Sequence, residues 1–187
     1  MEPLEAAVID WLVIVGEQPA GPGVRHGEHL APWWPISKTL SRWLHQAGFF
    51  DGELKRIRFW NVFPQHLGSP TADQRTEAYW ELSWRLFDSD PRPSVVVTLG
   101  REAANAFKVP REHRLDRDCG KTYRRVVNGL HAVGEPLYPF CVGYVFDVLP
   151  LPHPSGLNRT LNGAAGQLAL SRGLLKLKEM KDVYGKV

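Results

Sequence analysis

Cysteine is scarce in this sequence, and a long apolar run is missing from it. Only Cys119 and Cys141 occur among the 187 residues, and no CxxC pair is present. Two cysteines exclude a four-cysteine metal or iron–sulfur site and a disulfide framework, so we expect a reducing compartment. No apolar run reaches the roughly 18 residues of a membrane span. The first ten residues carry acids where a signal peptide carries basic residues, so we expect a cytoplasmic protein, or a nuclear one in a eukaryote.

The remaining composition is that of one ordinary globular domain, and we expect a single domain over residues 1–187. The apolar fraction is 43%, the charged fraction is 23%, and the formal net charge is +3. Lys and Arg outnumber Asp and Glu between Arg101 and Arg125, in a pattern that fits either a phosphate-binding patch or a solvated loop.

Short apolar runs alternate with helical patterns along the chain. Runs that are apolar throughout, rather than at every second residue, are typical of parallel strands buried on both faces. Such runs occupy residues 11–15, 57–63, 94–100 and 142–151. Helices are predicted over residues 36–47, with Gly48 as C-terminal cap; over 71–87, with Thr71 or Asp73 as N-terminal cap; over 101–107; and over 164–180. We therefore predict a three-layer α/β/α fold with a central four-stranded parallel sheet, and a loop or small hairpin over 109–139.

Polar residues follow three of these strands, at the sheet edge where ligands bind in open α/β sheets. Glu17 and Gln18 lie in "GEQPAGPG", where an acid can act as a base or stabilise a cation and an amide can orient water. An ordinary Gly-Pro turn explains the same residues. Asn61 lies inside an apolar strand, where its amide serves either the fold or the edge of a heterocycle.

Two further groups have both a structural and a functional interpretation. Trp33 and Trp34 stand between prolines, where aromatic rings pack in a core or stack on a planar ligand. His153 opens the stiff polar loop "HPSGLNR", which contains one leucine, and it is a candidate donor or acid.

Taken together, "GEQP" (16–19), "FWNV" (59–62), "TLGREAANAF" (98–107) and "HPSGLNR" (153–159) resemble the motifs of the uracil-DNA glycosylase superfamily, in order, over about residues 11–175. The resemblance implies a monofunctional glycosylase that flips a base out of DNA and hydrolyses its N-glycosidic bond. DNA, single- or double-stranded, would be the partner of a monomer, with no membrane partner and no metal or organic cofactor.

The resemblance also implies roles for individual residues. His153 would donate a hydrogen bond to the leaving base, Asn61 would read its edge, and Trp33 or Trp34 would stack on it. The loop after His153 would bind DNA: Leu157 as the wedge that fills the space left by the base, and Ser155, Gly156, Asn158 and Arg159 around it.

The first motif differs from that of classical uracil enzymes. Gln18 stands where those enzymes have Asp and related ones have Asn, and Gln cannot act as a base. Glu17 matches the acid of the "GEAPG" loop of the iron–sulfur family, so we favour Glu17 as water activator or cation stabiliser. Ala20 replaces a tyrosine that excludes the thymine methyl group, which leaves room at C5 for thymine or a larger 5-modified pyrimidine.

Two alternatives remain open. A catalytically weak DNA-binding or base-sensing protein on the same fold is favoured by Gln18, and it would bind DNA without releasing a base. A small-molecule hydrolase or nucleotide-binding α/β enzyme would leave Leu157 and the basic stretch without a role, and its weak DNA binding would not depend on salt.

Overall fold

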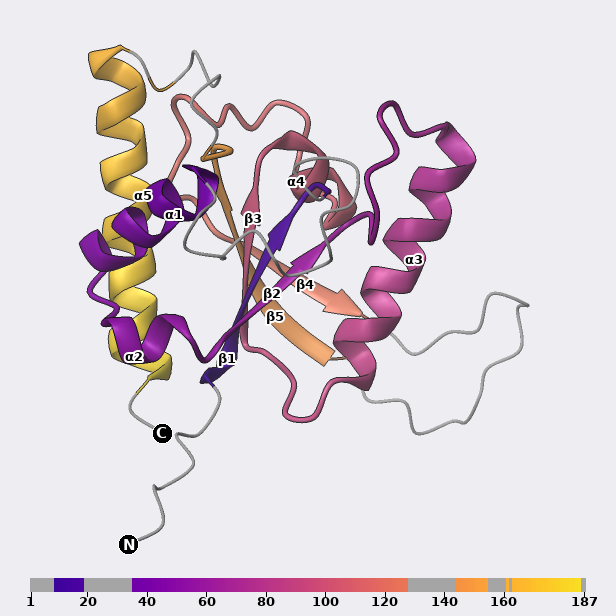
Figure 1. The fold of residues 1–187 in the computed structure, drawn as a ribbon, viewed down its shortest axis with the longest axis horizontal. Helices are drawn as coiled ribbons and strands as arrows, with labels where there is room; N and C mark the ends of the chain where they lie inside the picture. Colours follow the sequence, from indigo (N-terminus) through magenta and orange to yellow (C-terminus); the bar gives the residue numbers. More distant parts are fainter. Residues whose placement is uncertain (1–8, 19–34, 128–143, 155–160, 162, 186–187) are drawn as a thin grey trace, which may run out of the picture.

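The computed structural model describes residues 9–18, 35–127, 144–154, 161 and 163–185. Within these ranges the chain forms five strands and five helices, in the order β1-α1-α2-β2-α3-β3-α4-β4-β5-α5 (Figure 1). The strands are β1 (Ile9–Gly16), β2 (Ile57–Asn61), β3 (Val95–Leu99), β4 (Tyr123–Val127) and β5 (Tyr144–Leu151). The helices are α1 (Pro35–Gln46), α2 (Asp51–Leu54), α3 (Ala72–Asp88), α4 (Arg101–Ala106) and α5 (Ala164–Tyr184).

The strands form one sheet in the order β2-β1-β3-β5-β4. β1 pairs in parallel with β2 and β3, and β3 pairs in parallel with β5. The predicted four parallel strands are confirmed. β4 adds a fifth strand, antiparallel to β5, in the region for which a loop or small hairpin was predicted.

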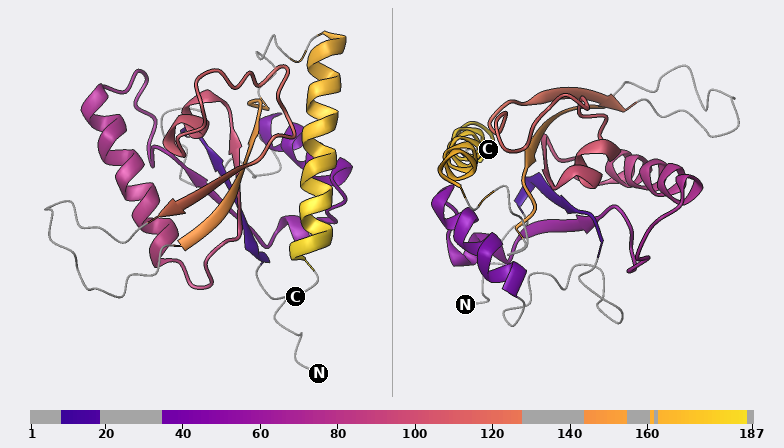
Figure 2. Two further views of the ribbon diagram at one scale, coloured as in Figure 1. Left: turned by 180° about the vertical axis from the view of Figure 1, so that it is seen from behind. Right: turned by 90° about the horizontal axis from the view of Figure 1, so that it is seen from above.

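Helices cover both faces of the sheet, which confirms the three-layer architecture. The view along the strands shows α1 and α5 on one side and α3 and α4 on the other (Figure 2). Alternate residues of β1 point to opposite faces: Leu12 and Ile14 pack with α1 and α5, whereas Val13 and Val15 pack with α3 and α4. The apolar runs are continuous because both faces are covered.

The predicted helix ends agree with the local chemistry. Thr71 is the N-cap of α3: its hydroxyl accepts a hydrogen bond from the Gln74 backbone N–H at 3.2 Å, and the Gln74 side chain accepts one from the Thr71 N–H at 2.9 Å. Gly48 follows α1 with a φ of +86°, a conformation that favours glycine. The short helix α2 was not predicted.

Among the described helices, none is long and apolar enough to cross a membrane.

The two faces of α5 provide a test of this packing. Leu177 is fully buried and Leu175 is 59% exposed on the same helix. Leu177→Ala should lower the free energy of unfolding by about 2–5 kcal/mol, because it leaves a cavity against the sheet. Leu175→Ala should change it by less than about 0.5 kcal/mol. Urea unfolding of both variants measures the difference, and equal losses would contradict the orientation of α5.

Candidate functional site

Residues that follow β1, β2, β3 and β5 come together at one edge of the sheet, because these parallel strands all end there. Glu17 and Gln18 follow β1, Asn61 ends β2, Gly100 follows β3, and His153 lies two residues beyond β5. This is the edge at which open α/β sheets bind ligands. The structure therefore brings together the four site residues that were predicted from the sequence and that lie in the described ranges.

Asn61 is held against the backbone of β1. It pairs with Gly16 in the parallel register, and Val62 N–H donates to the Gly16 carbonyl at 2.9 Å. A Cβ atom on Gly16 would lie only 2.9 Å from Asn61 Oδ1, so the missing side chain makes room for the amide. Asn61 is 5% exposed, and its Nδ2 is buried without a hydrogen-bond partner among the described residues.

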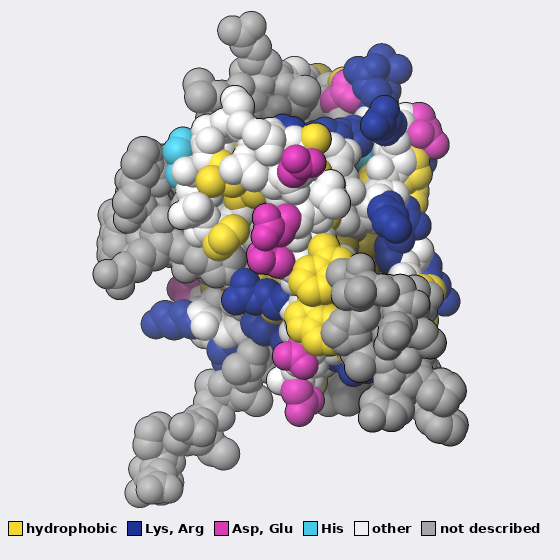
Figure 3. All heavy atoms as spheres, turned by 90° about the vertical axis from the view of Figure 1, so that its right-hand side faces the viewer, with side chains coloured by type: hydrophobic (Ala, Val, Ile, Leu, Met, Phe, Trp, Pro, Cys, Tyr) yellow, Lys and Arg dark blue, Asp and Glu magenta, His cyan; other side chains and the backbone are white. Residues whose placement is uncertain are grey.

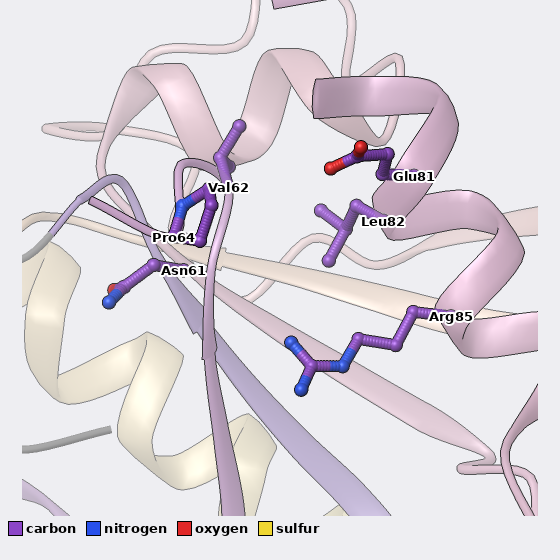
Figure 4. Close-up of a pocket in the computed structure, with 6 residues that line it drawn as sticks. All are labelled: Asn61, Val62, Pro64, Glu81, Leu82 and Arg85. Atoms are coloured by element: carbon purple, nitrogen blue, oxygen red, sulfur yellow. The ribbon is translucent and has the colours of Figure 1, made fainter. Parts of the chain in front are cut away.

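The amide of Asn61 does not point into the hollow beside α3. That hollow is lined by Asn61, Val62, Pro64, Glu81, Leu82 and Arg85. Figure 4 shows Arg85 and Leu82 pointing from α3 toward β2, while the Asn61 amide points away from them. Ile57 and Phe59, which share a strand face with Asn61, pack in the cluster under α1 and α5. The free amide nitrogen therefore faces the α1 and α5 side of the sheet.

Glu17 is anchored through its backbone, while its carboxyl group lies among other ionisable groups. Its carbonyl accepts a hydrogen bond from the Phe63 N–H at 2.9 Å. Burial raises the pKa of the Glu17 carboxyl, the negative charge of Glu102 raises it further, and the positive charge of Arg75 opposes both. A carboxyl group with a raised pKa is a stronger proton acceptor, as a general base requires.

Gln18 makes a contact that bears on its predicted role. Its Oε1 accepts a hydrogen bond from the Leu67 backbone N–H at 3.1 Å, which ties the end of β1 to the segment after β2. Because this bond uses the amide oxygen, the geometry favours a structural contribution from Gln18. Glu17 is then the better candidate of the two for activating water.

His153 packs closely on the glycine at the end of β3. The Gly100 N–H donates to the Leu151 carbonyl at 2.9 Å, and a Cβ on Gly100 would lie 3.3 Å from His153 Cβ. Gly100 also has a φ of +90°, which disfavours any other residue there. Burial lowers the pKa of the His153 imidazole, so the ring is neutral at neutral pH and offers one N–H as a donor.

The other predicted site residues lie outside the described residues. They are Ala20, Trp33, Trp34, Ser155, Gly156, Leu157, Asn158 and Arg159. Their roles stay predictions.

Many side chains of the basic stretch bond within the stretch or to nearby groups. Lys121 and Arg114 pair with Asp118 and Asp116, at 2.5 and 2.9 Å, and Arg124 pairs with Asp147 on β5. Arg125 donates to backbone carbonyls at 2.8–3.0 Å. For Arg114, Lys121, Arg124 and Arg125, these contacts support a structural role rather than a phosphate-binding one.

The outer surface of α3 carries an aromatic group beside acids. Trp80 and Trp84 stack with ring centroids 6.2 Å apart and are 46% and 39% exposed. Figure 3 shows hydrophobic and acidic side chains side by side on this face. Since α3 contains four acids (Asp73, Glu77, Glu81 and Asp88), this surface does not suit a phosphate backbone.

Among the described residues, no group of three His, Cys, Asp or Glu side chains is placed to hold a metal ion. Burial raises the pKa of the Cys119 thiol to about 12, so this cysteine is not a reactive nucleophile.

Three residues near Glu17 were not predicted from the sequence: Arg75 and Tyr79 on α3, and Glu102 on α4. Glu102 Oε1 accepts hydrogen bonds from the Tyr79 hydroxyl at 2.5 Å and from Arg75 Nε at 3.1 Å. The i, i+4 spacing of Arg75 and Tyr79 places both on one face of a helix, but nothing local in the sequence indicates their common partner.

The close approach of Gly16 to Asn61 can be tested by adding one methyl group. Gly16→Ala should displace the Asn61 amide and lower the free energy of unfolding by about 1–3 kcal/mol, the usual cost of overpacking. Urea unfolding and the NMR shifts of the Asn61 side-chain amide report the two effects. Gly52→Ala is the control, because a Cβ there meets no atom within 4 Å. Unchanged Asn61 shifts in Gly16→Ala would contradict the contact.

The sequence matches a known protein-family model over most of its length. The family model "Uracil DNA glycosylase superfamily" matches residues 11–172, which include β2 to β5, most of β1 and all the described residues of the candidate site. No curated relative matches the chain at a significant level. The match over residues 11–172 confirms the resemblance found in the motifs, and the chain belongs to the uracil-DNA glycosylase superfamily.

Proposed function

We propose that this protein is a monofunctional DNA glycosylase that flips uracil or a related modified pyrimidine out of DNA and hydrolyses its N-glycosidic bond. Members of the superfamily to which the chain belongs are glycosylases that act on DNA. The main support for this proposal is the buried Nδ2 of Asn61, which has no hydrogen-bond partner among the described residues. An unsatisfied buried donor costs about 1–3 kcal/mol, and a carbonyl of a flipped base would satisfy it.

Glu17, His153 and Asn61 each have a separate role in the proposed reaction. The C1′–N bond of the flipped nucleotide breaks, and its electron pair leaves with the base. A water oxygen bonds to C1′ and gives a proton to the Glu17 carboxylate. The negative charge of Glu17 also stabilises the positive charge that develops on the sugar. The neutral His153 ring donates a hydrogen bond to the base O2 as negative charge grows there, while Asn61 holds the base edge.

The residues beyond the described ranges complete the proposed site. Leu157 enters the duplex in place of the base, and Ser155, Gly156, Asn158 and Arg159 contact the DNA around it. Trp33 or Trp34 stacks on the flipped base. Ala20 leaves space at C5, so thymine or a larger 5-modified pyrimidine fits as well as uracil. The product is an abasic site, and the protein acts as a monomer, in the cytoplasm or in a nucleus.

A base-sensing protein without turnover is the second candidate. Gln18 favours it, because an amide cannot act as a general base and its oxygen already accepts a hydrogen bond from the Leu67 N–H. The two candidates differ in turnover: a sensor binds the target base but releases none.

His153→Ala should slow base release roughly 10²–10³-fold, the usual loss for one preorganised donor to a developing negative charge. Single-turnover rates with protein in excess of DNA measure the chemical step. His45→Ala is the matched control, since His45 is a partly exposed residue at the end of α1, hydrogen-bonded to Phe49. An unchanged rate in His153→Ala would remove the imidazole from the mechanism.

Asn61→Asp should shift the base preference toward cytosine, because a carboxylate accepts the N–H of the cytosine amino group where the amide donated. Competition between uracil- and cytosine-containing oligonucleotides measures the ratio of released bases. Asn61→Ala is the control, and it should lose activity without a change of preference. If the Asn61→Asp protein is destabilised but keeps the original base preference, Asn61 has a structural role only.

A further inference from the structure

Glu102 is a partly buried carboxylate in the first turn of α4, immediately after β3, and it is held from α3. The Tyr79 hydroxyl and Arg75 Nε both donate to its Oε1, at 2.5 and 3.1 Å. The side chain of Glu102 is 15% exposed and that of Arg75 is 39% exposed. Two donors on one oxygen restrict the carboxylate to one position, and Arg75 makes an ion pair with it.

Val13 and Val15 of β1 pack against α3 and α4, and Glu17 follows them at the same two-residue spacing, on the side of the sheet that carries this group. Within the described part of the chain, the ionisable groups that interact electrostatically with Glu17 are Arg75 and Tyr79 on α3 and Glu102 on α4. Glu102 and Arg75 act on Glu17 in opposite directions, since one is a like charge and the other is an opposite charge. Tyr79 stays protonated, because burial and its bond to Glu102 raise the pKa of its hydroxyl.

We propose that Glu102, fixed by Tyr79 and Arg75, is a positioning residue that places a second negative charge beside Glu17 and makes Glu17 a stronger base. This inference rests on the proposed function, because it assigns Glu102 to the step in which Glu17 takes a proton from water. Glu102 itself touches neither water nor DNA in this step.

The fixed carboxylate explains how an acid at the end of β1 is tuned for this step. A carboxyl group with an ordinary pKa is a weak proton acceptor near neutral pH, and proton transfer improves as the pKa of the base approaches the working pH. Burial raises the pKa of Glu17, and the neighbouring charge of Glu102 raises it further. The positive charge of Arg75 opposes this rise.

The proposal predicts shifts of opposite sign in two variants. Glu102→Gln keeps an oxygen that accepts from Tyr79 and Arg75 but removes the negative charge. Glu17 should then lose its proton at lower pH, and the acid limb of the rate profile should move to lower pH. Arg75→Gln removes the positive charge, and the same limb should move to higher pH. A general loss of structure would lower the rate at every pH and would not produce opposite shifts.

The experiment combines the pH dependence of single-turnover base release with an NMR titration of the Glu17 side-chain carboxyl in the full-length protein. Glu81→Gln is the matched control, because it neutralises a carboxylate on α3 that does not act on Glu17, and it should move neither quantity. Tyr79→Phe is a second variant in case Glu102→Gln does not fold. Loss of its hydroxyl removes one of the two donors that fix Glu102 Oε1, so the carboxylate is no longer held in one position. The shift should then have the direction of Glu102→Gln and a smaller size.

The two possible failures can be distinguished. Opposite shifts of the NMR midpoint and of the acid limb in Glu102→Gln and Arg75→Gln would support the role of Glu102. If the wild type releases base but Glu102→Gln moves neither the NMR titration midpoint of Glu17 nor the acid limb of the rate profile, Glu102 does not have that role. The proposed function would remain intact. A midpoint that moves in a protein that releases no base would contradict the proposed function instead.

Discussion

The parallel pairing of β1 with β2 is the constraint on which the site depends. It places Gly16 opposite Asn61 and continues through backbone hydrogen bonds from Val62 and Phe63 to the carbonyls of Gly16 and Glu17. The bare backbone of Gly16 lets the Asn61 oxygen lie against it, and Glu17 follows directly. This register places Asn61, the candidate base-reading residue, beside the end of β1 that carries Glu17, the candidate general base. A shift by one residue would turn Asn61 to the other face of the sheet.

Burial at the end of the sheet has opposite effects on the two ionisable groups of the candidate site. It raises the pKa of Glu17 and lowers that of His153, because in each case it disfavours the charged form. The same environment therefore produces a stronger proton acceptor and a neutral hydrogen-bond donor. Of these two groups, only Glu17 is also affected by the negative charge of Glu102, which raises its pKa further.

The layers and the four parallel strands could be predicted from the sequence, because a strand covered on both faces is apolar at nearly every position, as in Val95–Leu99, where only Thr98 is polar. The edge strand β4 could not, since Tyr123–Val127 contains two arginines and owes its pairing to β5, about twenty residues later. Glu17, Asn61 and His153 stood out as polar residues at strand ends. Glu102 did not, because its partners lie 23 and 27 residues away on a different helix. The bond from Leu67 to Gln18 spans 49 residues and is likewise set by the tertiary fold.

Detection of a released free base is the most direct test of the proposed glycosylase activity. Purified protein would be incubated with single- and double-stranded oligonucleotides that carry uracil, thymine opposite guanine, 5-hydroxymethyluracil or hypoxanthine, and released bases would be identified by mass spectrometry. We expect a free pyrimidine base, either uracil or a 5-substituted pyrimidine, together with an oligonucleotide that carries an abasic site. Binding to these oligonucleotides without release of any base would contradict the glycosylase and favour the base sensor.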